Sequence, residues 1–543
     1  MKLEKKEFQW LPHLENSIPL SAKGYTMSFY SIALEGWRRG LKLKFINENR
    51  RRSELLFELE SDKNKYKFVV SRGELITSEA QLICRNKIET KEYLLKNNVS
   101  TPKGQKFEKD TDDKDIISFA NKTGYPLVIK PSDGTGGRGV IAGIEDEAAF
   151  IEALKYIRED LRYKEVIVEN YFQGDDFRVY VIDKEVVGII KRIPANVVGD
   201  GQSTIAELIE EKNKLRQKSP ILSSSLIKID KELRNMLQQI GYDTDSVPSK
   251  AERVFLKSKN NISAGGDPVD ITNEVSEEIQ QVAIDGVNSI PGLPHAGVDL
   301  MVNEDTGKAT IIEINTQANI RTHLFPMIGE ARDIPSKLID YYFPETKSIR
   351  RDPLLYFEVG QVKDMFTNGS LKEYVYPKLP KGKIVATRFL ISGKVQGVNY
   401  GAWVRRKARD LDLNGYVKFL ESSQVSIIVA GEESRIEEFR RLIHSSSSRD
   451  AKIVDIEEKN RGNPVKIGFT IVNASFDQKI EDGYFPVRLE GISRLGKKKV
   501  NKKRKKRNKK VKNYEKKYNE LISSRSWKIT KPLRLVARIV KKQ

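Results

Sequence analysis

The sequence predicts a mixed α/β protein with more than one domain, and three observations point to this class. The chain has 543 residues, which exceeds the length of one ordinary domain. From about residue 80 to 343, short apolar strands such as YPLVIKP (125–131) alternate with helical patterns such as EAAFIEALKYIRED (147–160). A second unit begins near Thr387 and follows the order strand, helix, strand, strand, helix, strand.

These observations divide the chain into five predicted parts. We expect a small α/β lead-in (1–80), a large α/β domain (81–344), a linker with a turn-rich middle (345–383), a compact α/β sandwich (384–474) and a basic, partly disordered tail (475–543).

The composition excludes several classes of protein. Hydrophobic residues make up 38% and charged residues 31%, which favours packed cores under a highly charged surface. The single cysteine, Cys84, excludes an intrachain disulfide and zinc sites built on several thiolates. We find no apolar run long enough to cross a bilayer, and the N-terminus lacks the apolar segment of a secretory signal. We therefore expect a cytoplasmic protein.

The net charge of +21 is concentrated in the tail. Residues 497–512 consist almost entirely of Lys and Arg and contain no acid. Such a block is normally solvated and disordered, but it can also hold an anionic membrane or an acidic polymer. A basic amphipathic segment with Trp527 follows, which suits a peripheral position at the inner membrane face.

The stretch IIEINTQANIRTH (311–323) carries two oxygen-bearing side chains at the end of an apolar run. Glu313 and Asn315 share one face of a strand, since side chains alternate along it. Together with Asp299 in AGVDLMV they form a set of hard oxygen ligands, which suits a Mg²⁺ ion that bridges nucleotide phosphates. The competing interpretation is that both are solvent-facing residues of an edge strand.

A glycine-rich loop follows a predicted strand in VIKPSDGTGGRGV (128–140). Glycines let backbone N–H groups approach phosphate oxygens closely, and Lys130 at the end of the strand can neutralise charge. The loop is not a Walker A loop, because no Gly-Lys-Ser/Thr follows. Taken alone, it can also be an ordinary turn.

Seven blocks of the sequence together resemble the ATP-grasp fold, and most of all its amino-acid and peptide ligases. The closest likenesses are to the cyanophycin synthetase and bifunctional glutathione synthetase branch. The blocks, in the order of that family, are RNKIETKEYLLKNNVSTPKG, VIKPSDGTGGRGV, VENYFQGDDFRVYVI, KRIPANVVGDGQSTIAELIEEKN, NISAGGDPVDIT, HAGVDLMV and IIEINTQANIRTHLFPMIGEARDI.

The resemblance implies a role for each matching residue. Contacts with the ATP phosphates are implied for Lys87 and Lys130, and the loop that covers the phosphates is implied at Asp133, Gly134, Gly136, Gly137 and Gly139. The adenine hinge is implied at Glu169 and Phe172, and a contact with the ribose at Asp176. Magnesium ligands are implied at Asp299, Glu313 and Asn315. Catalytic cations are implied at Arg178, Lys191 and Arg192, and an acceptor-side role at Arg321 and His323.

The implied reaction is the activation of a carboxylate by ATP, with Mg²⁺ as the metal and Mn²⁺ as its alternative. The carboxylate is phosphorylated, and an amine attacks the acyl-phosphate to form an amide. Small-molecule or peptide carboxylates and amines are therefore the expected partners, and a homodimer is possible. One departure from the cyanophycin branch concerns the acceptor side, because Ala318 and Asn319 replace a Pro-Gly pair.

Residues 384–474 resemble acylphosphatase, a ferredoxin-like sandwich whose loop after the first strand holds phosphate. Gly393, Gln396 and Gly397 are retained. The catalytic arginine of that family falls on Gly401, and its catalytic asparagine falls on Phe419. Glycine and phenylalanine can neither bind phosphate nor orient water. We therefore expect no acylphosphatase activity, although the domain can still bind an anion or dock a partner.

Two other classes of function stay open at this point. The chain can be a non-catalytic scaffold that binds ATP or serves an envelope assembly without turnover. It can also bind nucleic acid through residues 497–512, but no aromatic stacking platform accompanies this run, which makes nucleic acid an unfavoured partner.

Overall fold

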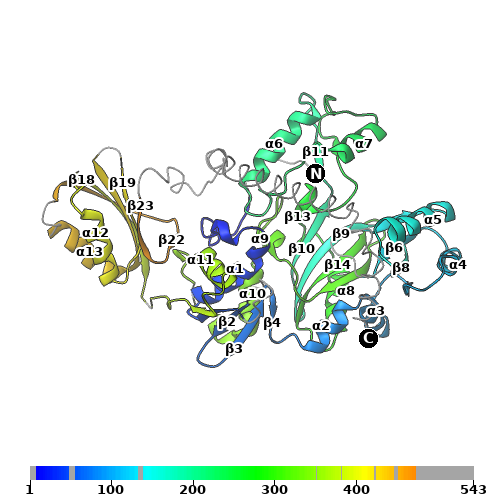
Figure 1. Ribbon diagram of the computed structural model, residues 1–543, viewed down its shortest axis with the longest axis horizontal. Coiled ribbons are helices and arrows are strands. Elements are labelled where there is room, and N and C mark those ends of the chain that lie inside the picture. The colour runs from blue at the N-terminus through cyan, green and yellow to red at the C-terminus, as the bar shows by residue number, and fades with distance from the viewer. Residues whose placement is uncertain are drawn as a thin grey trace, which may run out of the picture. The chain divides into compact units, whose positions relative to one another are not determined.

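The computed structural model describes seven ranges of the chain, namely 8–47, 56–132, 139–349, 351–380, 382–420, 423–445 and 451–472. All of them belong to the first of two units into which the chain divides, Met1–Asp477. The mixed α/β class predicted from the sequence is confirmed (Figure 1). No helix in these ranges is long and apolar enough to cross a membrane.

The first part is an antiparallel sheet in the order β17-β1-β2-β3-β4. Its strands are β1 (Lys42–Ile46), β2 (Leu56–Glu60), β3 (Lys65–Val69), β4 (Arg72–Gly73) and β17 (Glu373–Val375). It shares one core with α1 (Met27–Arg38), α10 (Ile334–Tyr342) and α11 (Gly360–Thr367). The short helices η1 (Leu20–Ala22) and η2 (Gly24–Thr26) precede α1, and η5 (Pro344–Thr346) follows α10.

The described residues of the segment expected to be a linker, 345–383, include a helix and two strands. It supplies β17 to the first sheet, together with α11 and the short strand β16 (Leu355–Tyr356). Leu355, Phe357 and Val359 are completely buried in the same core. Proline, glycine and lysine around positions 377–383 suggested a linker, but the apolar run LLYFEV before them buries enough surface to fold.

The next part is a four-stranded sheet in the order β5-β8-β6-β7. It consists of β5 (Gly104–Phe107), β8 (Val166–Asn170), β6 (Leu127–Pro131) and β7 (Ile141–Ile144), packed against α4 (Asp113–Thr123) and α5 (Glu147–Lys155). A π-helical turn, η3 (Tyr156–Asp160), ends α5. The side chain of Asp146 caps α5 by accepting from the backbone N–H of Ala149.

A five-stranded sheet in the order β13-β10-β9-β14-β15 follows, and all its neighbouring strands are antiparallel. The strands are β13 (Asp267–Asp270), β10 (Glu185–Ile193), β9 (Asp175–Ile182), β14 (His295–Asn303) and β15 (Lys308–Asn315). Its core includes apolar residues of α8 (Glu277–Asn288), α2 (Ser78–Arg85) and α3 (Lys87–Lys96). The short helix α9 (Arg321–Leu324) follows β15.

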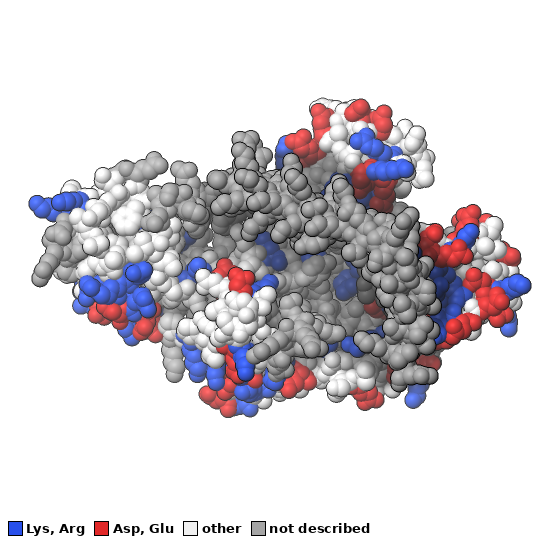
Figure 2. Space-filling model, viewed as in Figure 1, with Lys and Arg blue, Asp and Glu red and all other residues white. Residues whose placement is uncertain are grey.

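A small lobe extends from β10 and β13 (Figure 1). It pairs β11 (Asn196–Val198) with β12 (Arg253–Phe255) and carries α6 (Ile205–Lys218) and α7 (Lys231–Gln239), with η4 (Ile262–Ala264) leading back to β13. Thr204 and Glu207 form a capping box that begins α6. Figure 2 shows Lys and Arg interspersed with Asp and Glu on this lobe, so the excess positive charge of the chain is not gathered there.

The last described part is the predicted sandwich, with sheet order β21-β18-β20-β19-β23. Its elements are β18 (Ile384–Lys394), α12 (Tyr400–Asp410), β19 (Asn414–Phe419), β20 (Gln424–Glu432), α13 (Glu433–Ser445), β21 (Lys452–Asn460) and β23 (Phe469–Val472). Both helices pack on one face of the sheet, which gives the ferredoxin-like order predicted from the sequence (Figure 1). Strand β22 (Val465–Lys466) pairs with β16.

Candidate active site

Two carboxylates and one amide lie on one face of the five-stranded sheet, toward the end of β15. Asp299 stands directly opposite Glu313 in the antiparallel register, and Gly297 stands opposite Asn315. Residues that face each other across strands, or lie two apart along one strand, project to the same side. The structure therefore brings together the three oxygen-bearing side chains that the sequence singled out.

Asp299 is held by two arginines from the neighbouring strands. Arg178 of β9 donates from Nε to Asp299 Oδ1 at 2.5 Å and from Nη2 to Oδ2 at 2.9 Å. Arg192 of β10 donates from Nη2 to Asp299 Oδ1 at 3.1 Å. Such a two-pronged contact fixes both the carboxylate and the guanidinium in one orientation. Both oxygens of Asp299 are thus occupied by cationic donors.

Arg192 extends the chain of alternating charges to Asp176. Its Nε donates to Asp176 Oδ1 at 2.9 Å. Burial disfavours the charge of Arg192, but the carboxylates of Asp299 and Asp176 outweigh burial, so the pKa of Arg192 lies above its usual value. For Asp176, burial is the largest influence and raises its pKa, while Arg192 opposes the rise. Asp176, the residue for which the resemblance implies a ribose contact, is thus paired with Arg192.

Lys191 lies apart from this group. Its cross-strand partner is Phe177, whereas the partner of Arg178 is Ile190, so Lys191 and Arg178 project to opposite faces of the sheet. Its ammonium pairs with Asp175 and Glu304, each at 2.9 Å. The sequence-based grouping of Lys191 with the two arginines does not correspond to this placement, because neighbouring residues of a strand alternate between faces.

A second charged cluster occupies the four-stranded sheet beside α3. The carboxylate of Glu169 on β8 forms ion pairs with the ammonium groups of Lys130 of β6, at 2.7 Å, and Lys91 of α3, at 2.6 Å. All three side chains are buried. Burial raises the pKa of Glu169, but the two ammonium groups outweigh it, and the pKa lies below its usual value. Glu169 therefore stays charged and holds both lysines in place.

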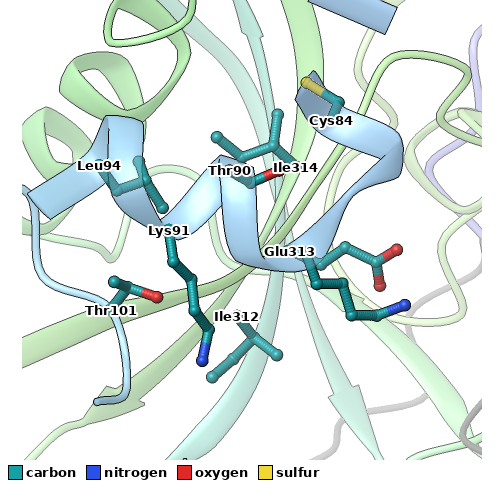
Figure 3. Close-up of a pocket in the computed structure, with 9 residues that line it drawn as sticks. Cys84, Thr90, Lys91, Leu94, Thr101, Ile312, Glu313 and Ile314 are labelled. Carbon is teal, nitrogen blue, oxygen red and sulfur yellow. The ribbon is translucent and has the colours of Figure 1, made fainter. Parts of the chain in front are cut away.

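Lys91 was not among the residues selected from the sequence. A signal was available, because Lys87 and Lys91 are four residues apart on one predicted helix and therefore share a face. Both line a small cavity between α3 and β15, together with Thr90 and Glu313 (Figure 3). This cavity brings the helix that carries the lysines next to the strand that carries Glu313.

The glycine-rich loop begins beside Lys87. The ammonium of Lys87 donates to the carbonyl oxygen of Ser132 at 3.3 Å, directly before the loop. The predicted phosphate contacts at Asp133, Gly134, Gly136 and Gly137 lie outside the described residues. Gly139 has φ of +76°, and a Cβ atom there would lie 2.8 Å from Pro131 Cγ, so this position requires glycine.

The expected adenine hinge lies between the two sheets. Phe172 is half-buried in the connection that leads from β8 to β9. This connection links the sheet with Lys130 to the sheet with Asp299.

The two acceptor-side candidates differ in their surroundings. His323 is completely buried, and neither ring nitrogen has a hydrogen-bond partner among the described residues. Burial, together with the positive charges of Arg178, Arg332 and Arg192, lowers the pKa of His323 to about 3. The buried imidazole of His323 is therefore neutral and lies near these arginines. Arg321 is only half-buried, and its guanidinium lies 4.7 Å from the centre of the Tyr25 ring.

In the sandwich, an aromatic ring fills the region where the resemblance to acylphosphatase implies a phosphate site. Gly401 lies on α12, and a Cβ atom there would be 2.7 Å from Cζ and 3.0 Å from Cε2 of Phe419 on β19. The two positions expected to carry an arginine and an asparagine are therefore neighbours, and Phe419 fills the space beside Gly401. Gln396 of the preceding loop donates to the carbonyl oxygen of Leu420 at 2.6 Å.

Comparison with known families agrees with this architecture. Residues 84–220 match the RimK-like ATP-grasp domain, and residues 387–471 match acylphosphatase. The chain thus contains an ATP-grasp domain followed by an acylphosphatase domain, as the sequence blocks predicted.

Individual relatives match more than half of this chain. The chain is 32% identical over 333 residues to the glutathione biosynthesis bifunctional protein GshAB of Clostridium perfringens, covering 58% of this chain and 41% of that protein. It is 34% identical over 316 residues to cyanophycin synthetase of Trichormus variabilis, covering 56% and 33%. A solved bifunctional glutathione synthetase from Pasteurella multocida is 27% identical, with a TM-score of 0.43, covering 53% and 40%. The chain therefore spans less than half the length of these relatives.

Proposed function

We propose that the protein is an ATP-dependent ligase that joins a carboxylate to an amine through an acyl-phosphate. The observation that carries this proposal is the row of Asp299, Glu313 and Asn315 on one sheet face with Arg178 beside it. The nearby cluster of Lys130, Glu169 and Lys91 supports it, because it places buried cations where a triphosphate would need them.

ATP would lie between the two sheets. Lys87 and Lys130 would contact its phosphates, the loop that ends at Gly139 would cover them, and the segment from Glu169 to Phe172 would receive the adenine. The relatives named glutathione biosynthesis protein and cyanophycin synthetase support a reaction that forms peptide-like bonds.

The donor set at the end of β15 fits a divalent cation. Carboxylate and amide oxygens are the ligands that Mg²⁺ prefers, and Mn²⁺ accepts the same set. Asp299, Glu313 and Asn315 would hold the ion, which would offset charge on the phosphates during transfer.

The protein side chains would act by orientation and charge. A carboxylate oxygen of the substrate attacks the γ-phosphorus of ATP and ADP leaves; the amine then attacks the carbonyl carbon, loses a proton, and phosphate leaves. Arg178 and Arg192 carry positive charge beside the reacting groups, and their pairing with Asp299 and Asp176 limits their movement before the reaction. In the same way, the ion pairs with Glu169 limit the movement of Lys130 and Lys91.

Release of ADP and phosphate from Mg²⁺-ATP tests this function against pools of amino acids and short peptides. We expect release that requires a particular acid and amine and that is lost in Glu313→Ala. ATP binding without turnover in any pool would instead favour the non-catalytic scaffold.

The acylphosphatase domain is proposed to be inactive as a hydrolase. The contact between Gly401 and Phe419 supports this, since a ring occupies the place of an anion-binding side chain. Purified protein should hydrolyse acetyl phosphate no faster than the buffer alone does. Hydrolysis above that rate would contradict the proposal.

The basic run 497–512, which lies outside the described residues, is proposed to hold the protein at an anionic surface in the cytoplasm. Co-sedimentation with phosphatidylserine vesicles that declines with salt would support it. Equal sedimentation with neutral vesicles would contradict it.

A further inference from the structure

The segment after β15 is fastened to the N-terminal part of the chain. Ser71 Oγ donates to the carbonyl oxygen of Ala318 at 2.6 Å. Ser28 Oγ lies 3.2 Å from Asn319 Oδ1 and accepts from the backbone N–H of Ile320 at 3.1 Å. These contacts fix the backbone directly before Arg321, so the direction in which Arg321 projects is fixed as well.

This segment lies next to the proposed catalytic row. A Cβ atom at Gly297 would collide with the Cβ of Ala318 and would lie 3.5 Å from Arg178 Nη1. Gly297 is two residues before Asp299 and stands opposite Asn315. Ala318 and the backbone that leads to Arg321 therefore pack against the end of the sheet that carries the oxygen ligands.

Arg321 differs from the other arginines around it in its partners. Arg178, Arg192 and Arg332 each pair with an aspartate. Arg321 makes no ion pair with any carboxylate of the described chain. Its guanidinium instead lies over the ring of Tyr25, a residue that is 77% exposed. A ring face occupies one side of a guanidinium and leaves the N–H donors at its edge free.

We propose that Arg321 and Tyr25 form a subsite for a substrate carboxylate that the reaction does not consume. This inference rests on the proposed ligase function and names the class of substrate. Amide formation uses one carboxylate, whereas an amino acid or short peptide retains another. A half-buried guanidinium without a protein counter-ion binds such a group by two parallel hydrogen bonds. The retained carboxylate belongs either to the amine acceptor or to the activated acid.

The test compares each substrate found in the ADP-release assay with the analogue in which the retained carboxylate is a carboxamide. We expect the protein to prefer the carboxylate, and Arg321→Gln to raise KM for it by about 10- to 100-fold while kcat changes little. Arg321→Gln should also abolish the preference over the carboxamide. Tyr25→Leu should raise KM by about two- to fivefold. Amidating the acceptor and the acid separately shows which of them Arg321 binds.

Arg234→Gln, at an exposed arginine of α7, serves as the matched control and should leave KM and the preference unchanged. Loss of kcat at constant KM in Arg321→Gln, or an unchanged preference, would overturn the inference. If no pool supports turnover, calorimetric titration of amino acids and dipeptides into protein with Mg²⁺-ADP separates the two proposals. Binding that Arg321→Gln abolishes would sustain the subsite without the ligase, and no binding by the unmodified protein would overturn it.

Discussion

The two domains differ in what occupies the functional positions expected from their families. In the ATP-grasp domain, several charged side chains of the proposed site pair with a side chain of opposite sign, as Asp299 does with Arg178 and Glu169 does with Lys130. In the acylphosphatase domain, the two expected functional positions hold a glycine and a phenylalanine that pack on each other. The comparison teaches that a fold survives the loss of its site when the emptied space is refilled.

The largest expected effect concerns Asp299. Asp299→Asn keeps the shape of the side chain but removes the charge that orients Arg178 and Arg192, so we expect substrate-dependent ADP release to fall by about 100-fold or more. Asp305→Asn, in the exposed turn of the same hairpin, is the matched control and should retain activity. Activity close to normal in Asp299→Asn would contradict a functional role of the Asp299 carboxylate, and the paired charges of the ATP-grasp domain would then no longer distinguish it from the inactive acylphosphatase domain.

The next effect concerns the refilled space. Gly401→Arg places a side chain against Phe419 and should destabilise the protein by about 1–3 kcal/mol. Adding Phe419→Asn should recover part of this loss, and the melting temperatures of the single and double variants measure the coupling. We also expect the double variant to bind inorganic phosphate more tightly than the unmodified protein. Additive effects of the two substitutions would show that the positions are independent.

Acid should weaken the ATP-grasp side of the molecule. Burial lowers the pKa of His295 to about 3, against about 6.5 in the unfolded chain. Between these values the unfolded state binds more protons, so stability rises with pH and is lost on acidification below about 6.5. His295 alone should account for a loss of about 2 kcal/mol at pH 5, and the buried His323 adds to the loss in the same direction.

Melting temperatures at pH 7 and pH 5 test this expectation in the unmodified protein and in His295→Gln. The difference between the two pH values should shrink in the variant. The acylphosphatase domain has one histidine, His444, which is exposed, so it provides the internal comparison. An unchanged pH dependence in His295→Gln would contradict the assignment.

The smallest expected effect concerns Gln396. Its hydrogen bond to Leu420 is exposed, so Gln396→Ala should cost about 1 kcal/mol or less. This variant should gain no phosphate binding, because Phe419 still fills the space beside Gly401. Phosphate binding gained in this variant would identify Gln396, rather than the ring of Phe419, as the group that prevents phosphate binding.

Much of this architecture could be predicted from the sequence. The alternation of side chains in a strand placed Glu313 and Asn315 on one face, and the sequence already grouped Asp299 with them. What the structure adds is the register that sets Asp299 opposite Glu313. The same rule shows why Lys191 and Arg192 separate. The order of elements in the sandwich also followed directly from its apolar pattern.

Other features depend on contacts between distant segments, which no local pattern contains. Tyr25 meets Arg321 across nearly 300 residues, and β17 joins a sheet whose other strands end before residue 74. Lys91 was missed for a different reason, since a lysine on an amphipathic helix usually faces solvent and only Glu169 on another strand draws it inward.

Isotope transfer tests the central claim, that the ATP-grasp domain activates a carboxylate, most directly. The acid substrate is labelled with ¹⁸O in its carboxylate, and the phosphate released during turnover with Mg²⁺-ATP is analysed by mass spectrometry. We predict that each phosphate carries one ¹⁸O atom, because the carboxylate oxygen that attacked phosphorus leaves with it. Unlabelled phosphate, formed at the same rate as the amide, would contradict the acyl-phosphate route.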